Sequence, residues 1–231
     1  MMRWTKILEP ISIISLLGCG IWIFMGTPIE TEMGFSQKIM YLHVPTVIVT
    51  YLAFFVVFAF SIAYLWKRDM MFDQVAKSSA EVGLIFCGLV LVTGAIWGKP
   101  TWGTYWVWDA RLTTTLLLFL IFAGYFLLRA FATDREREAR LASVLGIIGF
   151  LDIPIIHKSV EWWRTLHQPT TLLKVNEAGE AKPAMPMDLL LPLLVTMLAM
   201  LLFYGYLLFL RIQMEERYHV LQETIVKKEG A

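Results

Sequence analysis

Six long apolar stretches, separated by short polar segments, constrain the fold of this chain more than any other feature. They cover residues 8–26, 44–66, 79–97, 112–131, 141–156 and 187–211. Because about 20 apolar residues in a helix cross the hydrocarbon core of a bilayer, we expect about six transmembrane helices. The fifth stretch is short, and Pro154 near its end leaves the outer boundary open. The predicted fold is an all-α integral membrane protein, with residues 1–231 forming a single six-span domain.

The composition also favours a membrane protein, because it is more apolar than that of soluble domains. Of the 231 residues, 58% are hydrophobic and 17% are charged. A soluble domain is about half apolar and about one quarter charged. The net charge of +1 gives no reason to expect a nucleic-acid partner, so the lipid bilayer is the predicted surrounding.

The first apolar stretch resembles a signal peptide, but we expect it to be retained as a helix. Residues 1–6 are basic, and the apolar stretch follows them directly. Residues 26–28, Gly-Thr-Pro, offer no good small-x-small cleavage site, and five further apolar stretches come later.

The distribution of Lys and Arg predicts the orientation in the membrane. With the N-terminus inside, the cytoplasmic segments hold 13 of these residues and the outer segments hold 7. Cytoplasmic loops are enriched in Lys and Arg, so both termini are predicted to be cytoplasmic. Three loops then face outward, at about 27–43, 98–111 and 157–186, and residues 176–182 look like a flexible tip. The mixed-charge run 134–140 and the C-terminal tail, which holds His219, are predicted to be solvated or to form docking surfaces.

The most informative segment is 97–113, which holds five aromatic rings within twelve residues. The rings are those of Trp97, Trp102, Tyr105, Trp106 and Trp108. Trp and Tyr favour membrane interfaces, so an interfacial belt is one interpretation. The intervening Gly98, Pro100 and Gly103 indicate a shaped loop, and flat rings on such a loop suit a large, flat, apolar ligand. We therefore predict an outward-facing tryptophan-rich ligand-binding loop, with the belt as the alternative.

Charged residues close this segment and the fifth apolar stretch. Asp109 precedes the fourth helix, where its carboxylate can accept bonds from free N–H groups of the first turn. Arg111 can pair with Asp109 or receive a ligand carboxylate. Asp152 lies at the outer end of the fifth stretch, where a functional role and a helix cap remain alternatives.

Two histidines at outer boundaries are candidate metal ligands. His43 opens the second helix, and His167 lies in the last outer loop. Each could be a simple helix cap, but neutral imidazoles also ligate haem iron axially, one from each face. Zinc is the rival metal, with His157, His167 and a carboxylate as ligands, although no compact motif supports it. We expect His157 to lie deeper in the wall, in a packing or hydrogen-bonding role.

These residues resemble the haem exporter protein C (CcmC) family of bacterial cytochrome c maturation. Segment 97–113 is similar to the tryptophan-rich WWD signature of haem-handling membrane proteins. The resemblance extends to residues 39–45 (IMYLHVP), 151–157 (LDIPIIH) and 159–168 (SVEWWRTLHQ). It covers most of the chain and includes the six-span plan. Two positions depart from the family pattern: Tyr105 replaces an expected Trp, and Asp152 replaces an expected amide residue.

The resemblance implies that non-covalent haem b is bound at the outer, periplasmic face of the bacterial inner membrane. His43 and His167 match the family's two axial ligands. The implied partners are a periplasmic haem chaperone, which receives the haem, and the ATPase, permease and small membrane subunits of an ABC-type complex. The chain itself has no nucleotide-binding motif. It also has no C-x-x-C-H motif, and Cys19 and Cys87 are expected to pack as small apolar groups.

The predicted role is haem binding and transfer during c-type cytochrome biogenesis. We find no catalytic acid, base or nucleophile, and whether the protein promotes covalent attachment of haem to its partner is left open. A transporter that moves haem across the bilayer is the alternative, but it should have ionisable residues at mid-span depth. An electron carrier with haem b within the spans is a second alternative, and mid-span histidines are absent from the sequence.

Overall fold

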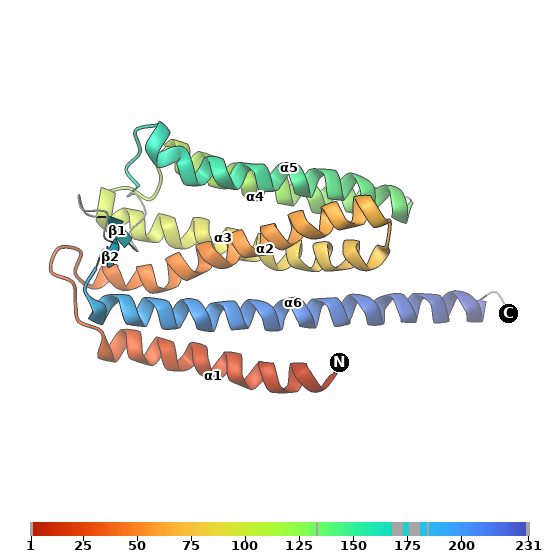
Figure 1. Cartoon of the computed structure of the whole chain (residues 1–231), viewed down its shortest axis with the longest axis horizontal. Coiled ribbons are helices and arrows are strands. Elements are labelled where there is room, and N and C mark those ends of the chain that lie inside the picture. Colours follow the sequence, from red (N-terminus) through yellow and green to blue (C-terminus); the bar gives the residue numbers. More distant parts are fainter. Residues whose placement is uncertain (1, 133, 168–172, 176–180, 184, 230–231) are drawn as a thin grey trace.

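The computed structural model confirms six long helices that run side by side (Figure 1). It describes residues 2–132, 134–167, 173–175, 181–183 and 185–229. The helices are α1 (Met2–Gly26), α2 (Met40–Lys67), α3 (Met70–Trp102), α4 (Ala110–Phe131), α5 (Arg135–Trp162) and α6 (Met187–Glu229), and the 3-10 helix η1 (Phe35–Ile39) leads into α2. Each α-helix contains a window long and apolar enough to cross a membrane.

Three helices begin where an aspartate supplies the N-cap. The side chains of Asp69, Asp109 and Asp134 accept hydrogen bonds from the backbone N–H groups of residues 71, 112 and 137. Such a bond satisfies one of the free N–H groups of a first helical turn. Gly103 caps the C-terminus of α3, and its φ of 80° lies in the left-handed region that glycine adopts readily.

Several predicted boundaries were wrong, because polar segments extend the helices beyond the apolar stretches. Helix α3 begins at Met70 rather than near residue 79, and it ends at Trp102 rather than near residue 97. Gly98, Pro100 and Trp102 therefore lie in helical turns, not in a loop as expected. Helix α5 continues through Pro154 to Trp162, because the loss of one backbone bond is tolerated where neighbouring helices pack against the segment.

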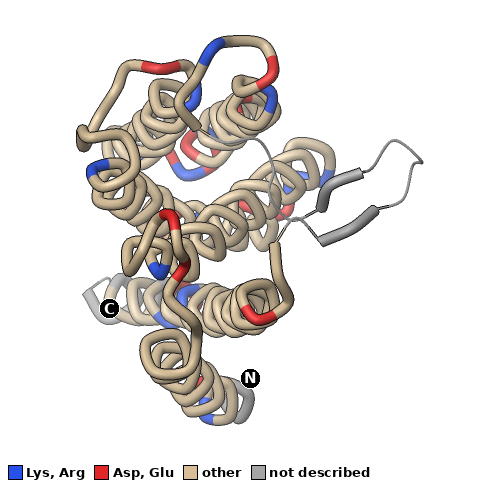
Figure 2. Tube along the Cα trace, turned by 90° about the vertical axis from the view of Figure 1, so that its left-hand side faces the viewer, with Lys and Arg blue, Asp and Glu red and all other residues tan. Residues whose placement is uncertain are grey.

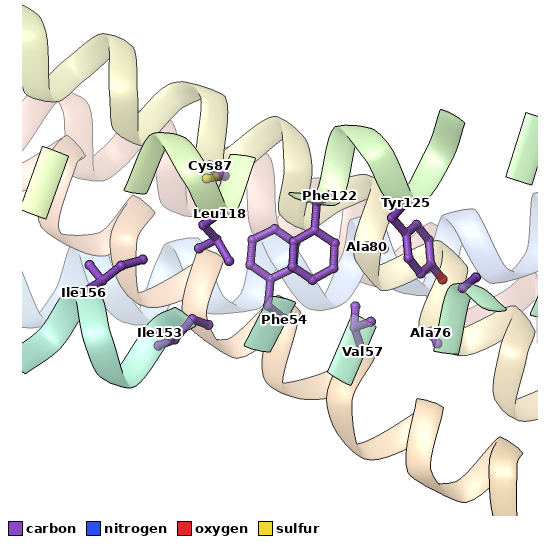
Figure 3. Packing of buried hydrophobic residues seen from close by; sticks show 11 residues of the cluster. Phe54, Val57, Ala76, Ala80, Cys87, Leu118, Phe122, Tyr125, Ile153 and Ile156 are labelled. Atoms are coloured by element: carbon purple, nitrogen blue, oxygen red, sulfur yellow. The ribbon is translucent and has the colours of Figure 1, made fainter. Parts of the chain in front are cut away.

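The helices are arranged as three adjacent pairs, α4 with α5, α2 with α3, and α1 with α6 (Figures 1 and 2). Helix α2 occupies the centre and contacts α3, α5 and α6. The central core is sealed by Phe54 of α2 and Phe122 of α4, whose rings stack with centroids 3.6 Å apart (Figure 3). Gly83 and Gly149 make room for this pair, since an added Cβ would lie 2.9 Å from the Phe54 ring and 2.8 Å from the Phe122 ring, respectively.

The described parts of the three loops predicted to share one side lie at one end of the bundle, and the first turn of α1 and the last turn of α6 lie toward the other (Figure 1). The last of these loops also holds a two-stranded antiparallel hairpin, β1 (Leu173–Val175) with β2 (Ala181–Pro183), which the all-α prediction did not include. Lys174 pairs with Lys182 in its register. Of the predicted flexible tip, residues 181–182 belong to β2, and residues 176–180 lie outside the described part of the chain.

The beginning of the C-terminal tail is a packed helix rather than a solvated segment. Helix α6 runs on to Glu229 and extends past the other helices (Figure 1). Glu215 is buried and pairs with Lys77 of α3 at 2.5 Å. Arg211 pairs with Glu81, and Gln74 donates to the backbone carbonyl of residue 212. Opposite charges from α3 hold this segment, which sequence alone could not show. The side chain of His219 is outside the described part.

Candidate functional site

A cavity opens at the loop end of the bundle, between α2, α3 and α4. Its empty volume is about 620 Å³, including the space at its mouth. It is lined by His43, Val47, Thr50, Tyr51, Val90, Leu91, Gly94, Ala95, Trp102, Trp106, Arg111, Leu112, Thr115, Leu118 and His167. The structure thus brings together His43 and His167, which are far apart in sequence, on the wall of one mostly apolar cavity.

His43 is held in a defined orientation by Thr93 of α3. Its side chain is buried, and its Nδ1 lies 2.9 Å from the Thr93 hydroxyl oxygen. That hydroxyl donates its own proton to the carbonyl of Leu89 at 2.6 Å. The Thr93 oxygen therefore accepts from Nδ1–H of His43, which leaves Nε2 as the nitrogen with a lone pair. Gly94 lies against the same ring, and an added Cβ there would be 3.1 Å from its Cε1 atom.

His167 is held by Arg111 and Trp102. The Arg111 Nη1 atom lies 3.2 Å from Nδ1 of His167. The Trp102 ring meets the imidazole edge-on, with centroids 6.0 Å apart. The backbone N–H of His167 donates to the Thr165 hydroxyl at 3.1 Å, which closes a tight turn just after α5. A loop residue is thereby fixed against α3 and α4.

Of the five aromatic rings of segment 97–113, three lie at the cavity or against His43, and two are exposed. Trp102 and Trp106 line the cavity. Trp97 is half-buried and meets the His43 ring edge-on at 5.7 Å. Tyr105 and Trp108 point outward, with 60% and 76% of their surfaces exposed, so they form a rim. The indole N–H groups of Trp97 and Trp106 are buried without a hydrogen-bond acceptor among the described residues.

A second, smaller hollow adjoins the first. Its empty volume is about 340 Å³, and its lining includes Met33, Trp97, Gly98 and Thr101. Trp102 and His167 line both spaces. His167 and the Trp102 indole therefore stand between the main cavity and the loop that precedes α2.

Asp109 and Arg111 do not form a pair in the described structure. One oxygen of Asp109 accepts from the backbone N–H of residue 112 at 2.8 Å, and the other is buried without a partner among the described residues. Asp109 is thus a helix cap. Arg111 lines the cavity and is the one Lys or Arg among its described lining residues.

Two other polar residues, His157 and Asp152, complete the set of predicted candidates. His157 has an exposed side chain on α5, so the prediction of a packing role deep in the wall was wrong. It lies one turn past Pro154 on an unbroken helix, which turns it outward. Asp152 is buried, and one of its oxygens has no partner among the described residues. The described part of the chain contains no cluster of three or more His, Cys, Asp or Glu residues that could hold a metal ion. It therefore gives no support to the alternative of a zinc site.

Thr93 and Tyr51 are site residues that sequence reasoning missed. Tyr51 of α2 lines the cavity, as does Arg111 of α4. Thr93 precedes Trp97 by four residues, so both project from one face of α3. Both residues lie within the predicted stretch 79–97, so this helical spacing was an available signal.

Comparison with known proteins identifies the family. The chain matches the family described as Heme exporter protein C over residues 1–227. It belongs to the heme exporter protein C family. It is 40% identical over 195 residues to Heme exporter protein C of Bradyrhizobium diazoefficiens, covering 83% of this chain and 71% of that protein. With its six apolar helices, this family member is a multi-pass protein of the bacterial inner membrane.

Two further relatives extend the comparison. Heme exporter protein C of Haemophilus influenzae is 40% identical over 203 residues, covering 87% of this chain and 80% of that protein. A ccmC-like mitochondrial protein of Marchantia polymorpha, named for cytochrome c biosynthesis, is 36% identical over 170 residues, covering 74% of this chain and 71% of that protein. Membership of the family therefore rests on most of the chain and agrees with the resemblance seen in its motifs.

Proposed function

We propose that this member of the heme exporter protein C family binds haem b non-covalently between His43 and His167, at the outer face of the inner membrane, for delivery during c-type cytochrome biogenesis. The observation that carries the proposal is the convergence of these two imidazoles on one cavity. A pair of imidazoles is a common axial ligand set for haem iron. The bound haem supplies the iron chemistry, while the protein supplies ligation and orientation.

The cavity suits a large, flat, apolar molecule with acidic groups at one edge. Its lining is mostly apolar with a few polar groups, as is usual for ligand pockets. Trp102 and Trp106 offer flat faces, and Arg111 offers a cation for a carboxylate. The buried indole N–H of Trp106 has no acceptor among the described residues, as expected for a donor that meets a ligand.

The outer rim supports transfer to a partner. Tyr105, Trp108, Trp162 and Trp163 are all exposed near the cavity end of the bundle. Exposed aromatic side chains are enriched in protein interfaces. We therefore assign the rim to docking of a periplasmic haem chaperone, and the remaining surfaces to the ATPase, permease and small membrane subunits of an ABC-type complex. With the cavity at the periplasmic face, both termini are cytoplasmic.

The packing below the cavity favours delivery at one face over movement of haem across the bilayer. Leu118 forms part of the cavity wall and is fully buried. Next to Leu118, the stacked rings of Phe54 and Phe122 fill the core of the bundle (Figure 3). A path through the protein would have to separate this closely stacked pair.

Visible spectra of the purified full-length protein in detergent, with added ferric haem b, test the proposal. Two imidazole ligands should give a six-coordinate, low-spin spectrum. His43→Ala and His167→Ala should each shift the iron toward high spin and weaken binding, and added imidazole should restore the low-spin spectrum. His157→Ala is the matched control, because His157 is exposed on α5 and outside the cavity. An unchanged low-spin spectrum in the double His43→Ala, His167→Ala variant would exclude the axial pair.

A further inference from the structure

The two cavity histidines carry their ring protons on opposite nitrogens. At His43, Nδ1–H donates to Thr93. At His167, Nδ1 faces the Arg111 guanidinium at 3.2 Å. A guanidinium has only donors, so Nδ1 of His167 must be the acceptor. In a neutral imidazole the proton of His167 then resides on Nε2, the reverse of the arrangement in His43.

This difference decides which imidazole can bind iron first. Iron binds a nitrogen through its lone pair, so a ligand imidazole must present an unprotonated nitrogen. The lone pair of His43 is on Nε2, since Thr93 accepts the proton on Nδ1. The lone pair of His167 is occupied by the Arg111 cation. Only His43 is therefore prepared for ligation in this structure.

We propose that Arg111 is a latch on His167 that a carboxylate of the incoming haem releases. The inference rests on the proposed function and adds an order of events to it. Arg111 and His167 line the same cavity, so a propionate entering there meets the guanidinium directly. A carboxylate accepts two parallel bonds from a guanidinium and carries a full charge, so it competes well against a neutral imidazole nitrogen. His43 binds iron first, and His167 binds after Arg111 has moved to the propionate.

The release step requires no net change in protons or electrons. When Arg111 leaves Nδ1, this nitrogen takes a proton from water, and the Nε2 proton of His167 passes to water. The ring remains neutral and becomes the Nδ1–H tautomer, as in His43. The turn at Thr165, which holds the backbone N–H of His167, is unaffected by this exchange.

The test compares ferric haem b with its dimethyl ester, in which both propionates are neutral. The probe is added to the full-length protein in detergent, and the spin state is read from the visible spectrum. Haem b should give a low-spin spectrum. The ester should stay mostly high-spin, because Arg111 remains on His167 and only His43 binds iron. Added imidazole should convert the ester complex to low spin, which shows that its sixth position is open.

Replacing the latch should reverse the result for the ester. Arg111→Met keeps the length of the side chain but removes its donors, so the ester complex should become low-spin. Lys99→Met is the matched control, since Lys99 is an exposed cation at the end of α3 that does not line the cavity. It should leave the ester complex high-spin. Circular dichroism should show unchanged helix content in both variants.

Stopped-flow mixing with the wild-type protein provides a second measurement that needs no variant. Haem b should bind in two phases, a high-spin phase followed by conversion to low spin, and the ester should show the first phase alone. A low-spin ester complex in the wild type, a high-spin one in folded Arg111→Met, or single-phase formation of low-spin haem b would overturn the latch while leaving the axial pair intact. Failure of the proposed function gives a different result, namely haem b spectra that do not respond to the loss of His43 and His167.

Discussion

Arg129 of α4 binds the carboxylate of Asp73 of α3 at two points, at the end of the bundle opposite the cavity. The Nη1–Oδ2 and Nη2–Oδ1 distances are 3.2 Å and 2.5 Å, and both residues are buried. Arg129 also donates to the hydroxyl of Tyr125 and to the carboxylate of Glu138 at the start of α5. This one guanidinium therefore ties together three helices where the polar ends of the spans meet.

Loss of Arg129 should be strongly destabilising. Arg129→Met leaves the Asp73 charge buried and unpaired, and breaking a buried pair in this way costs about 3–5 kcal/mol. Thermal unfolding in detergent, followed by circular dichroism, should show a clearly lower midpoint. Arg140→Met is the control, because that side chain is exposed on α5. Replacing both partners, as Arg129→Met with Asp73→Leu, should recover part of the loss, and no recovery would argue against the pair as its cause.

The stacked core pair predicts a steric effect at a glycine. Gly149→Ala places a Cβ 2.8 Å from the Phe122 ring, so the ring or the backbone of α5 must move. We expect destabilisation of about 1–3 kcal/mol, the usual cost of overpacking a core. At Gly124 of α4 an added Cβ meets nothing within 4 Å. Gly124→Ala should therefore be neutral or slightly stabilising in the same thermal assay, and equal effects of the two variants would refute this explanation.

Lys38 is predicted to hold the C-terminal end of α1 in place. Its buried ammonium donates to the carbonyls of Ile23 and Thr27 at 2.6 and 3.2 Å, where a helix end leaves carbonyls without partners. Lys38→Met should lower stability by about 1.5–3 kcal/mol, the range for hydrogen bonds to charged groups. Limited proteolysis of the loop after α1 should also become faster. Lys6→Met replaces an exposed lysine of α1 and should have neither effect.

The placement of the aromatic rings separates ligand contacts from rim residues. Trp102→Ala and Trp106→Ala should each weaken binding of ferric haem b about tenfold, which corresponds to about 1.4 kcal/mol. Trp108→Ala should change this affinity little, since 76% of its surface is exposed and it does not line the cavity. Titration followed by the Soret band measures all three. Equal losses for the three variants would mean that the rings act as a single interfacial belt.

The orientation can be tested with single added cysteines. Both native cysteines, Cys19 and Cys87, are buried and should react little with a membrane-impermeant maleimide. In intact spheroplasts Glu32→Cys, in the loop before α2, should be labelled. Arg140→Cys, near the start of α5, should be labelled only after the membrane is opened. Both positions carry exposed side chains. Labelling of Arg140→Cys alone in intact spheroplasts would reverse the proposed orientation.

The sequence alone determined the six spans and their common loop end, for a physical reason that acts locally. A run of about 20 apolar residues must form a helix in a bilayer, because its backbone groups have no other partners there. Local rules also predicted the N-cap at Asp109, because this hydrogen bond involves only the first turn of the helix that follows. The motifs of segments 39–45, 97–113 and 159–168 likewise indicate the family through the order of their residues alone.

Only the tertiary structure decided which of these residues face one another. His43, Thr93, Arg111 and His167 come from three helices and a loop, and no local pattern encodes that Thr93 would hold one imidazole and Arg111 the other. No local pattern encodes the exposure of Tyr105 and Trp108 or the outward direction of His157 either. The relative rotation of packed helices sets these contacts. That rotation depends on side chains such as Phe54 and Phe122, whose stacking and glycine-lined spaces arise only when distant segments meet.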